Sequence, residues 1–137
     1  GDGLRAVKVG GDLVPSTVDE LPLVAVLATQ AEGETVVREA AELRVKESDR
    51  ISAMAEALAA MGANIRETED GWIIRGPTPL KGVTCRTFLD HRVAMALAVA
   101  SLVADGETVI EGAESVATSF PTFANVLASL GARVRMT

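Results

Sequence analysis

Apolar positions along this chain recur with helical spacing in some stretches and with strand spacing in others. Between residues 48 and 61 an apolar side chain returns every three or four residues, which predicts an amphipathic helix closed by Gly62. Its expected buried face consists of Ile51, Met54, Ala55, Leu58 and Met61. Residues 93–104 are apolar except for Ser101, which indicates a helix buried on most faces. This run is too short to span a membrane, which needs about 20 apolar residues.

The same patterns, bounded by turn residues, predict the other elements. We expect helices over residues 19–32, 48–61, 90–104 and 119–130, and strands over residues 4–9, 34–39, 64–68, 72–75, 82–88, 107–111 and 132–136. The strands 64–68 and 72–75 would form a hairpin around the polar turn 69–71. Because strands and helices alternate, the chain is expected to have an α/β architecture.

Particular residues predict how the helices begin and end. Thr17 and Glu20 match a T-x-x-E capping box for the first helix, and Gly33 is expected to follow its last turn. Asp90 and Ser119 are expected to cap the helices that follow them.

Two short segments recur about 70 residues further along the chain. The sequence AEGETVV at 31–37 returns as ADGETVI at 104–110, and MGANIR at 61–66 returns as LGARVR at 130–135. A period of this length is long for a solenoid and indicates one supersecondary unit used twice. We therefore expect a first unit over about residues 3–77 and a second over about residues 82–137.

Composition narrows the class of protein. Among 137 residues, 48 % are hydrophobic and 23 % are charged, which excludes a disordered chain. The net charge of −6 and an aromatic content of 3 % argue against a nucleic-acid partner. A single cysteine, Cys85, and a single histidine, His91, exclude a disulfide framework and any multi-Cys or multi-His metal site. We expect Cys85 and Trp72 to be packing residues and His91 to be structural.

Two arginines stand where a helix disfavours them. Arg50 and Arg92 fall in the first turns of their expected helices, where the macrodipole opposes a cation by about 0.3–1 kcal/mol. Ligands of open α/β proteins bind at such strand-to-helix junctions, so both cations could face one phosphate or carboxylate. Alternatively, Arg50 pairs with Asp49 or Glu47, and Arg92 pairs with Asp90.

Further candidates lie at the same junctions. Lys46 and Glu47, flanked by Arg44 and Arg50, could act as a proton-transfer pair beside a bound anion, or could be part of a solvated charged segment. Asp19 is not needed for the capping box and is therefore available to face a ligand.

Three motifs resemble those of the 5-enolpyruvylshikimate-3-phosphate (EPSP) synthase family. LRVKESDRI at 43–51 resembles the family signature R-V-K-E-[ST]-D-R, and DHRVAMA at 90–96 resembles D-H-R-x-A-M. SFPTF at 119–123 resembles a third motif, and the resemblance runs from about residue 3 to about residue 135.

The resemblance implies a fold and a reaction. The enolpyruvyl transferase fold has two similar domains, each made of three β-α-β-α-β-β units in an inside-out α/β barrel. Residues 1–137 would be a partial C-terminal domain with two of those units. The family transfers the enolpyruvyl group of phosphoenolpyruvate to the 5-hydroxyl of shikimate 3-phosphate in the cytoplasm, without metal or cofactor, on the route to aromatic amino acids. It is the target of glyphosate.

Matched positions carry the family's roles. Asp19 would lie beside the 5-hydroxyl as a base or orienting group. Lys46 would contact shikimate 3-phosphate and take part in proton transfer, and Glu47 would transfer a proton at the phosphoenolpyruvate methylene. Arg50 and Arg92 would bind phosphoenolpyruvate.

Two positions depart from the family pattern. Thr118 stands where many members have a lysine that contacts phosphoenolpyruvate, a form similar to a bacterial class with reduced glyphosate sensitivity. Glu42 stands where other members have an asparagine that faces shikimate 3-phosphate, so it is left out of the site.

The N-terminal domain of the family, which supplies the other half of the substrate site, is not in this sequence. We therefore expect the chain to be inactive alone and to self-associate through apolar faces left uncovered. The alternative is a non-catalytic module of the same fold that binds anions or assists assembly.

Overall fold

The computed structural model describes residues 8–9, 20–46, 48–112 and 134–136. The helices within these residues are α2 (Leu21–Gln30), the short 3-10 helix η3 (Ala41–Val45), α3 (Arg50–Ala60) and α4 (His91–Ala100). The strands are β1 (Lys8–Val9), β2 (Gly33–Val37), β3 (Asn64–Thr68), β4 (Gly71–Gly76), β5 (Leu80–Lys81), β6 (Thr84–Arg86), β7 (Ala104–Asp105), β8 (Thr108–Glu111) and β9 (Val134–Met136).

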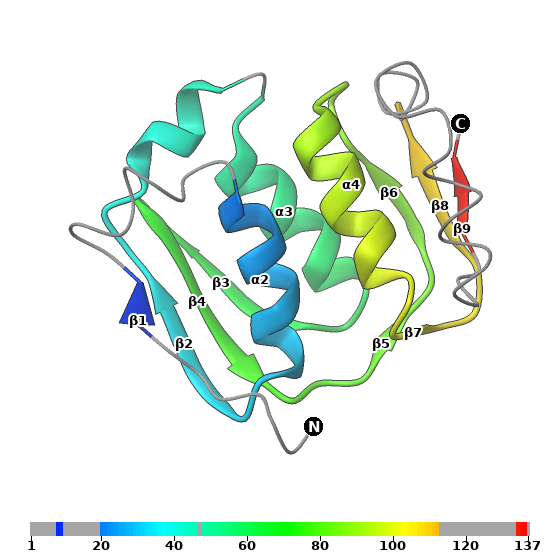
Figure 1. Cartoon of the computed structure of the whole chain (residues 1–137), viewed down its shortest axis with the longest axis horizontal. Helices are drawn as coiled ribbons and strands as arrows, with labels where there is room; N and C mark the ends of the chain where they lie inside the picture. The colour runs from blue at the N-terminus through cyan, green and yellow to red at the C-terminus, as the bar shows by residue number, and fades with distance from the viewer. Residues whose placement is uncertain (1–7, 10–19, 47, 113–133, 137) are drawn as a thin grey trace.

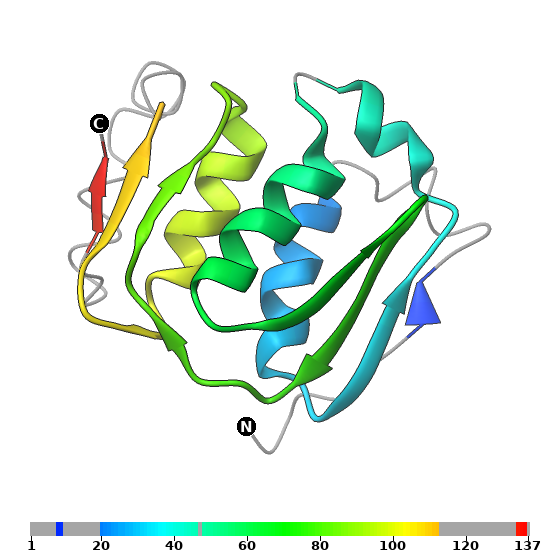
Figure 2. The same cartoon turned by 180° about the vertical axis from the view of Figure 1, so that it is seen from behind.

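Helices form the inner layer of the fold and sheets form its outer sides. Figure 1 shows α2, α3 and α4 side by side, all running in the same direction, with a sheet along each side of the helix layer. One sheet has the order β1-β2-β4-β3, with β1 parallel to β2 and the other pairs antiparallel. The other sheet, β6-β8-β9, is entirely parallel. The same arrangement is seen from behind in Figure 2. The expected α/β architecture is confirmed.

The core lies where the three helices meet the sheets. The expected buried face of α3 is confirmed, because Ile51, Met54, Ala55, Leu58 and Met61 are all buried. The indole of Trp72 is fully buried, and its Nε1–H donates to the Ile51 carbonyl at 2.9 Å. This hydrogen bond satisfies the polar end of the ring and fastens β4 to α3. Cys85 is also in the core, as expected.

Helix α3 ends as the sequence predicts. Gly62 has φ +104°, its N–H donates to the Ala59 carbonyl at 3.0 Å, and the Ala63 N–H donates to the Leu58 carbonyl at 2.9 Å. These two bonds form a Schellman motif, which needs a left-handed residue and therefore favours glycine.

The expected role of Gly33 at the end of α2 is wrong. Helix α2 stops at Gln30, Ala31 is extended, and Gly33 is already the first residue of β2. The chain after β4 ends the helix instead, because the Thr78 N–H donates to the Thr29 carbonyl at 2.8 Å and Gln30 Nε2 donates to the Thr78 carbonyl at 2.9 Å.

Helix α4 and the strand before it are shorter than expected. Helix α4 ends at Ala100 and does not extend to residue 104. Residues 104 and 105 form the strand β7, which pairs in parallel with β5. The strand expected over 82–88 is described only as β6. It stops before Phe88 and Leu89, whose φ angles of 54° and 60° are incompatible with a strand.

The ends of the chain are described only in part. The first and last expected strands appear as β1 and β9, and the helix expected over 119–130, with its cap Ser119, lies outside the described residues. No described helix is both long enough and apolar enough to cross a membrane.

Candidate functional site

The first turns of α2, α3 and α4 lie at the same end of the helix layer (Figures 1 and 2). Three of the junctions that the sequence singled out therefore share one edge of the molecule. Unpaired backbone N–H groups at helix N-termini favour anions, so this edge has the polarity of an anion site.

A single carboxylate joins two of these junctions. Asp90 caps α4, because its Oδ1 accepts from the backbone N–H groups of Arg92 at 3.0 Å and Val93 at 3.4 Å. Its Oδ2 accepts from Arg50 Nε at 2.8 Å and from Ser48 Oγ at 2.8 Å. The expected capping role of Asp90 is confirmed, and the carboxylate also binds the start of α3.

The Arg50–Asp90 pair is buried. The side-chain exposures of Arg50 and Asp90 are 2 % and 0 %. Burial raises the pKa of the Asp90 carboxyl, but hydrogen bonds from Arg50 and Ser48, the charge of Arg50 and the Val93 N–H outweigh it, so the pKa lies below its ordinary value. Asp90 is therefore an ionised acceptor at neutral pH. The sequence suggested only neighbours as partners of Arg50, and a partner in the other repeat was missed.

Asp49, which the sequence offered as a partner of Arg50, instead caps helix α3. Its Oδ1 accepts from the Ser52 N–H at 3.1 Å, so the helix begins one residue after Asp49 and not at Ser48. Its Oδ2 accepts from Arg44 Nη1 at 2.8 Å. Burial raises the pKa of Asp49, but the Ser52 and Arg44 hydrogen bonds outweigh it and lower the pKa overall.

Arg44 is a structural clamp and not a flanking cation of the site. Its Nε and Nη2 donate to the carbonyls of Glu69 and Thr68 at 2.8 and 2.7 Å, and Nη2 also pairs with Glu67 Oε2 at 2.9 Å. Together with the Asp49 bond, these contacts fasten η3 and the start of α3 to the β3–β4 hairpin. The donors of Arg44, which the sequence placed beside the Lys46–Glu47 pair, are directed to this hairpin and to Asp49.

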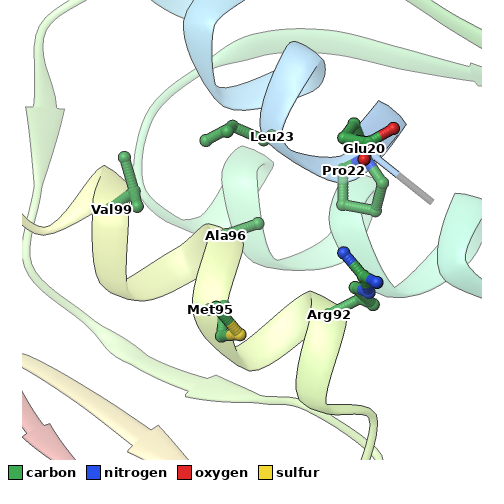
Figure 3. Close-up of a pocket in the computed structure, with 7 residues that line it drawn as sticks. All are labelled: Glu20, Pro22, Leu23, Arg92, Met95, Ala96 and Val99. Carbon is green, nitrogen blue, oxygen red and sulfur yellow. The ribbon is translucent and has the colours of Figure 1, made fainter. Parts of the chain in front are cut away.

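Arg92 has different surroundings from Arg50. It lies at one end of an apolar groove of about 120 Å³ between α2 and α4. The other residues of the groove are Glu20, Pro22, Leu23, Met95, Ala96 and Val99 (Figure 3). Within the described residues, the Arg92 guanidinium has no carboxylate partner, so the suggested side-chain pair with Asp90 is wrong. Asp90 accepts from the Arg92 backbone N–H only, because its other oxygen is directed to Arg50.

The turn before Asp90 is strained and anchored. Phe88 and Leu89 have positive φ angles, which for bulky residues mark a constrained backbone. Buried Thr87 holds this turn, because its Oγ1 donates to the Glu111 carbonyl at 2.7 Å and its carbonyl accepts from the Asp90 N–H at 2.9 Å. The sheet β6-β8 thereby fixes the position of Asp90.

The structure describes some of the expected site residues. Arg50 and Arg92 share one edge, and Lys46 follows η3, where its Nζ pairs with Glu42 Oε1 at 3.2 Å. Asp19, Glu47 and Thr118 lie outside the described residues. Ser48 was missed as a site residue, although it lies inside the motif that drew attention to Lys46 and Arg50.

The described residues offer neither a reactive thiol nor a metal site. Burial raises the pKa of the Cys85 thiol to about 11, so it is not a nucleophile at neutral pH. Within the described ranges, no group of three or more His, Cys, Asp or Glu side chains is arranged to hold a metal ion.

Parallel helices flanked by two sheets, with arginines in the first turns of α3 and α4, define a protein of the α/β class. The family model of EPSP synthase (3-phosphoshikimate 1-carboxyvinyltransferase) matches residues 3–127. This chain therefore belongs to the EPSP synthase family and has its fold.

Individual relatives agree with that assignment. The chain is 55 % identical over 124 residues to 3-phosphoshikimate 1-carboxyvinyltransferase of Alkaliphilus oremlandii, covering 90 % of this chain and 29 % of that protein. It is 56 % identical over 128 residues to the protein of the same name from Anaeromyxobacter sp. strain Fw109-5, covering 93 % and 30 %. A solved structure of EPSP synthase from Acinetobacter baumannii superposes with a TM-score of 0.84 at 42 % identity, covering 96 % of this chain and 31 % of that one. The chain spans about 30 % of the length of the curated relatives it matches.

Proposed function

We propose that this chain is part of the C-terminal domain of an enzyme that transfers the enolpyruvyl group of phosphoenolpyruvate to the 5-hydroxyl of shikimate 3-phosphate and releases phosphate. The observation that carries this proposal is the contact between the two family motifs through Asp90, which holds Arg50 and the first turn of α4 at one edge. Asp90 thereby links the two family motifs, one from each repeat, at this edge of the helix layer.

The arginines would bind the two charged groups of phosphoenolpyruvate. A guanidinium matches both phosphate and carboxylate geometry. Arg92 is suited to this role because its guanidinium has no carboxylate partner within the described residues. Thr118 would make a secondary contact with the same substrate.

The chemistry is an addition followed by an elimination. Glu47 would deliver a proton to the methylene carbon of phosphoenolpyruvate, which makes C2 electrophilic. The 5-hydroxyl of shikimate 3-phosphate would add to C2 while Asp19 orients it or takes its proton, and Lys46 would contact this substrate and assist proton transfer. The tetrahedral intermediate then loses phosphate and a methyl proton to restore the double bond, and the cations stabilise the anionic groups throughout. The proposed reaction uses no metal and no organic cofactor, and we place it in the cytoplasm.

Because the chain spans about 30 % of its relatives, the proposed enzyme needs further segments to complete the substrate site. Aligned reactants contribute about 7–11 kcal/mol to catalysis, and half of a clamp forfeits much of this. We expect no phosphate release above background from the 137-residue chain, and release when the N-terminal part of a relative is added.

The decisive experiment compares variants in that reconstituted mixture. Glu47→Ala should abolish the restored release of phosphate, whereas Glu56→Ala, an exposed glutamate on α3 paired with Arg86, should leave it intact. Robust turnover by the isolated chain, or restored activity that survives Glu47→Ala, would overturn the proposal. A non-catalytic anion-binding module would instead bind phosphoenolpyruvate in calorimetry, with no dependence on Glu47 and no restored turnover.

We also propose that the isolated chain self-associates. Leu23, Leu27, Leu102 and Val103 are 37 %, 46 %, 38 % and 50 % exposed on or just after α2 and α4. Exposed apolar side chains in this number favour association with a second copy of the same surface.

A further inference from the structure

Asp90 receives donors from both repeats. Arg50 Nε and Ser48 Oγ come from the start of α3, and the N–H groups of Arg92 and Val93 come from the start of α4. Each carboxylate oxygen serves one side, because Oδ2 accepts from the α3 side and Oδ1 from the α4 side. The carboxylate therefore links the N-terminal ends of α3 and α4, the two helices that carry the arginines.

The link that Asp90 forms between α3 and α4 is rigid because the Arg50–Asp90 ion pair is buried. A buried ion pair persists only when both charges are hydrogen-bonded, and breaking one partner leaves an uncompensated charge in the core. The side chains of Arg50 and Asp90 are 2 % and 0 % exposed, so this is a buried ion pair of that kind. The anchored turn at Thr87 also fixes Asp90 from behind through its bond to the Glu111 carbonyl. A shift of α4 relative to α3 would have to break these bonds.

We infer that Asp90 is a positioning residue that holds Arg50 and Arg92 at a fixed separation, so that the two arginines bind one anion as a unit. This inference rests on the proposed function, in which that anion is phosphoenolpyruvate. Asp90 itself transfers no proton, because both of its oxygens are occupied and it is fully buried. Its contribution acts through the guanidinium that it orients and the helix that it caps.

The first test uses the 137-residue chain and NMR signals of the Arg50 Nε–H and the Arg92 backbone N–H. In a titration with phosphoenolpyruvate, both signals should shift with one common dissociation constant. In Asp90→Asn the amide can still cap α4, but the ion pair is lost. Loss of a charge-assisted bond should weaken binding about 10- to 100-fold. Unchanged affinity in Asp90→Asn, signals with different midpoints in the wild type, or no response would overturn the inference.

The second test separates positioning from simple helix capping in the reconstituted enzyme. Asp90→Asn should raise KM for phosphoenolpyruvate about 10- to 100-fold and leave KM for shikimate 3-phosphate unchanged. In an Arg50→Gln background the same substitution should add little, because the group that it orients is already gone. Two effects that multiply fully would show that Asp90 acts only as a cap of α4, and the inference would be wrong.

Controls keep the test decisive. Asp49→Asn is the matched control, since Asp49 also caps a helix and also pairs with an arginine, Arg44, but contacts neither site arginine in the described bonds. It should lower stability without raising KM for phosphoenolpyruvate. If Asp90→Asn does not fold, Ser48→Ala removes one donor and keeps the ion pair. A rise in KM of a few-fold is then expected, and no rise would contradict the inference.

Failure of the two proposals can be told apart. If the reconstituted wild-type mixture shows no transfer, the proposed function fails. The anion titration of the isolated chain then still decides whether Asp90 couples the two arginines.

Discussion

Arg50 and Arg92 occupy the same position in successive helices, yet their surroundings differ. Arg50 is buried and bound to Asp90, whereas Arg92 is partly exposed at the end of an apolar groove and has no carboxylate partner among the described residues. Stability and ligand binding should therefore depend on the two arginines to different degrees.

Substitution of each arginine should separate these contributions. Arg50→Ala leaves the Asp90 carboxylate buried and unpaired, so it should lower the free energy of unfolding by about 3–5 kcal/mol. Arg92→Ala breaks no described ion pair and should change that energy by less than about 0.5 kcal/mol. Urea unfolding of the isolated chain measures both. Equal losses of stability would show that Arg92 has a structural partner of similar importance.

The lowered pKa of Asp90 makes a pH-dependence prediction with a definite sign. Its net pKa lies below the ordinary value of 3.8, so the unfolded chain binds the proton more readily than the folded chain. The pair therefore stabilises the fold fully at neutral pH, and this stability is lost as the pH falls below 3.8 and through the lower pKa of the folded state. Urea midpoints should fall in that range for the wild type and fall less for Asp90→Asn. A wild-type curve parallel to that of the variant would contradict the prediction.

At the scale of elements, the helix ends show which structural features could be predicted from the sequence. The end of α3 was predictable, because Gly62 at C′ is a local signal and the Schellman bonds involve only neighbours. Substitution of Gly62 tests how much backbone strain a residue other than glycine would introduce at this position. Gly62→Ala should destabilise the chain by about 1–2 kcal/mol, because φ +104° is left-handed.

Gly106→Ala is the matched control for Gly62→Ala. Gly106 has φ +86° and no atom within 4 Å of an added Cβ, whereas a Cβ at Gly62 would lie 3.3 Å from the Pro79 carbonyl oxygen. Thermal unfolding should show a loss for both variants and a larger loss for Gly62→Ala. If Gly106→Ala loses as much, the approach to Pro79 contributes nothing.

Contacts between distant segments are what the sequence could not reveal. Gly33 resembled a helix terminator, but the carbonyl of Thr29 is satisfied by the Thr78 N–H, which is 49 residues away. A pattern of neighbours carries no information about such a bond. The α3 face was predictable for the opposite reason, since helical spacing alone places its apolar residues on one side.

In the candidate site, too, local features were predictable from the sequence and contacts between distant residues were not. Arg50 and Arg92 were identifiable because each breaks a local rule, a cation at a helix N-terminus. Their link through Asp90 was not, because it joins residues 40 positions apart, and the sequence offered closer carboxylates for Arg50. The role of Arg44 was not predictable because its partners, Glu67 and the Thr68 and Glu69 carbonyls, lie in a hairpin beyond α3.

At the scale of the whole molecule, the inner helices leave part of their apolar surface open. Helices α2 and α4 pack against each other, and the groove between them is lined by Leu23, Met95 and Val99 (Figure 3). An apolar inner layer is stable in water when its faces are covered, and a chain about 30 % as long as its relatives has fewer segments to cover them. The exposed leucines of α2 are therefore the surface on which association should depend.

Self-association should follow the apolar character of that surface. Sedimentation equilibrium of the isolated chain should give an apparent mass that rises with concentration, because burial of apolar surface gives about 25 cal/mol per Å². Leu23→Lys with Leu27→Lys should shift the chain toward monomer, since both side chains are partly exposed and charged heads resist burial. Glu56→Lys, at an exposed position on α3, controls for the change in net charge. A wild-type chain that stays monomeric at high concentration would show that these leucines are individually tolerated, because single exposed apolar side chains are common on monomeric proteins.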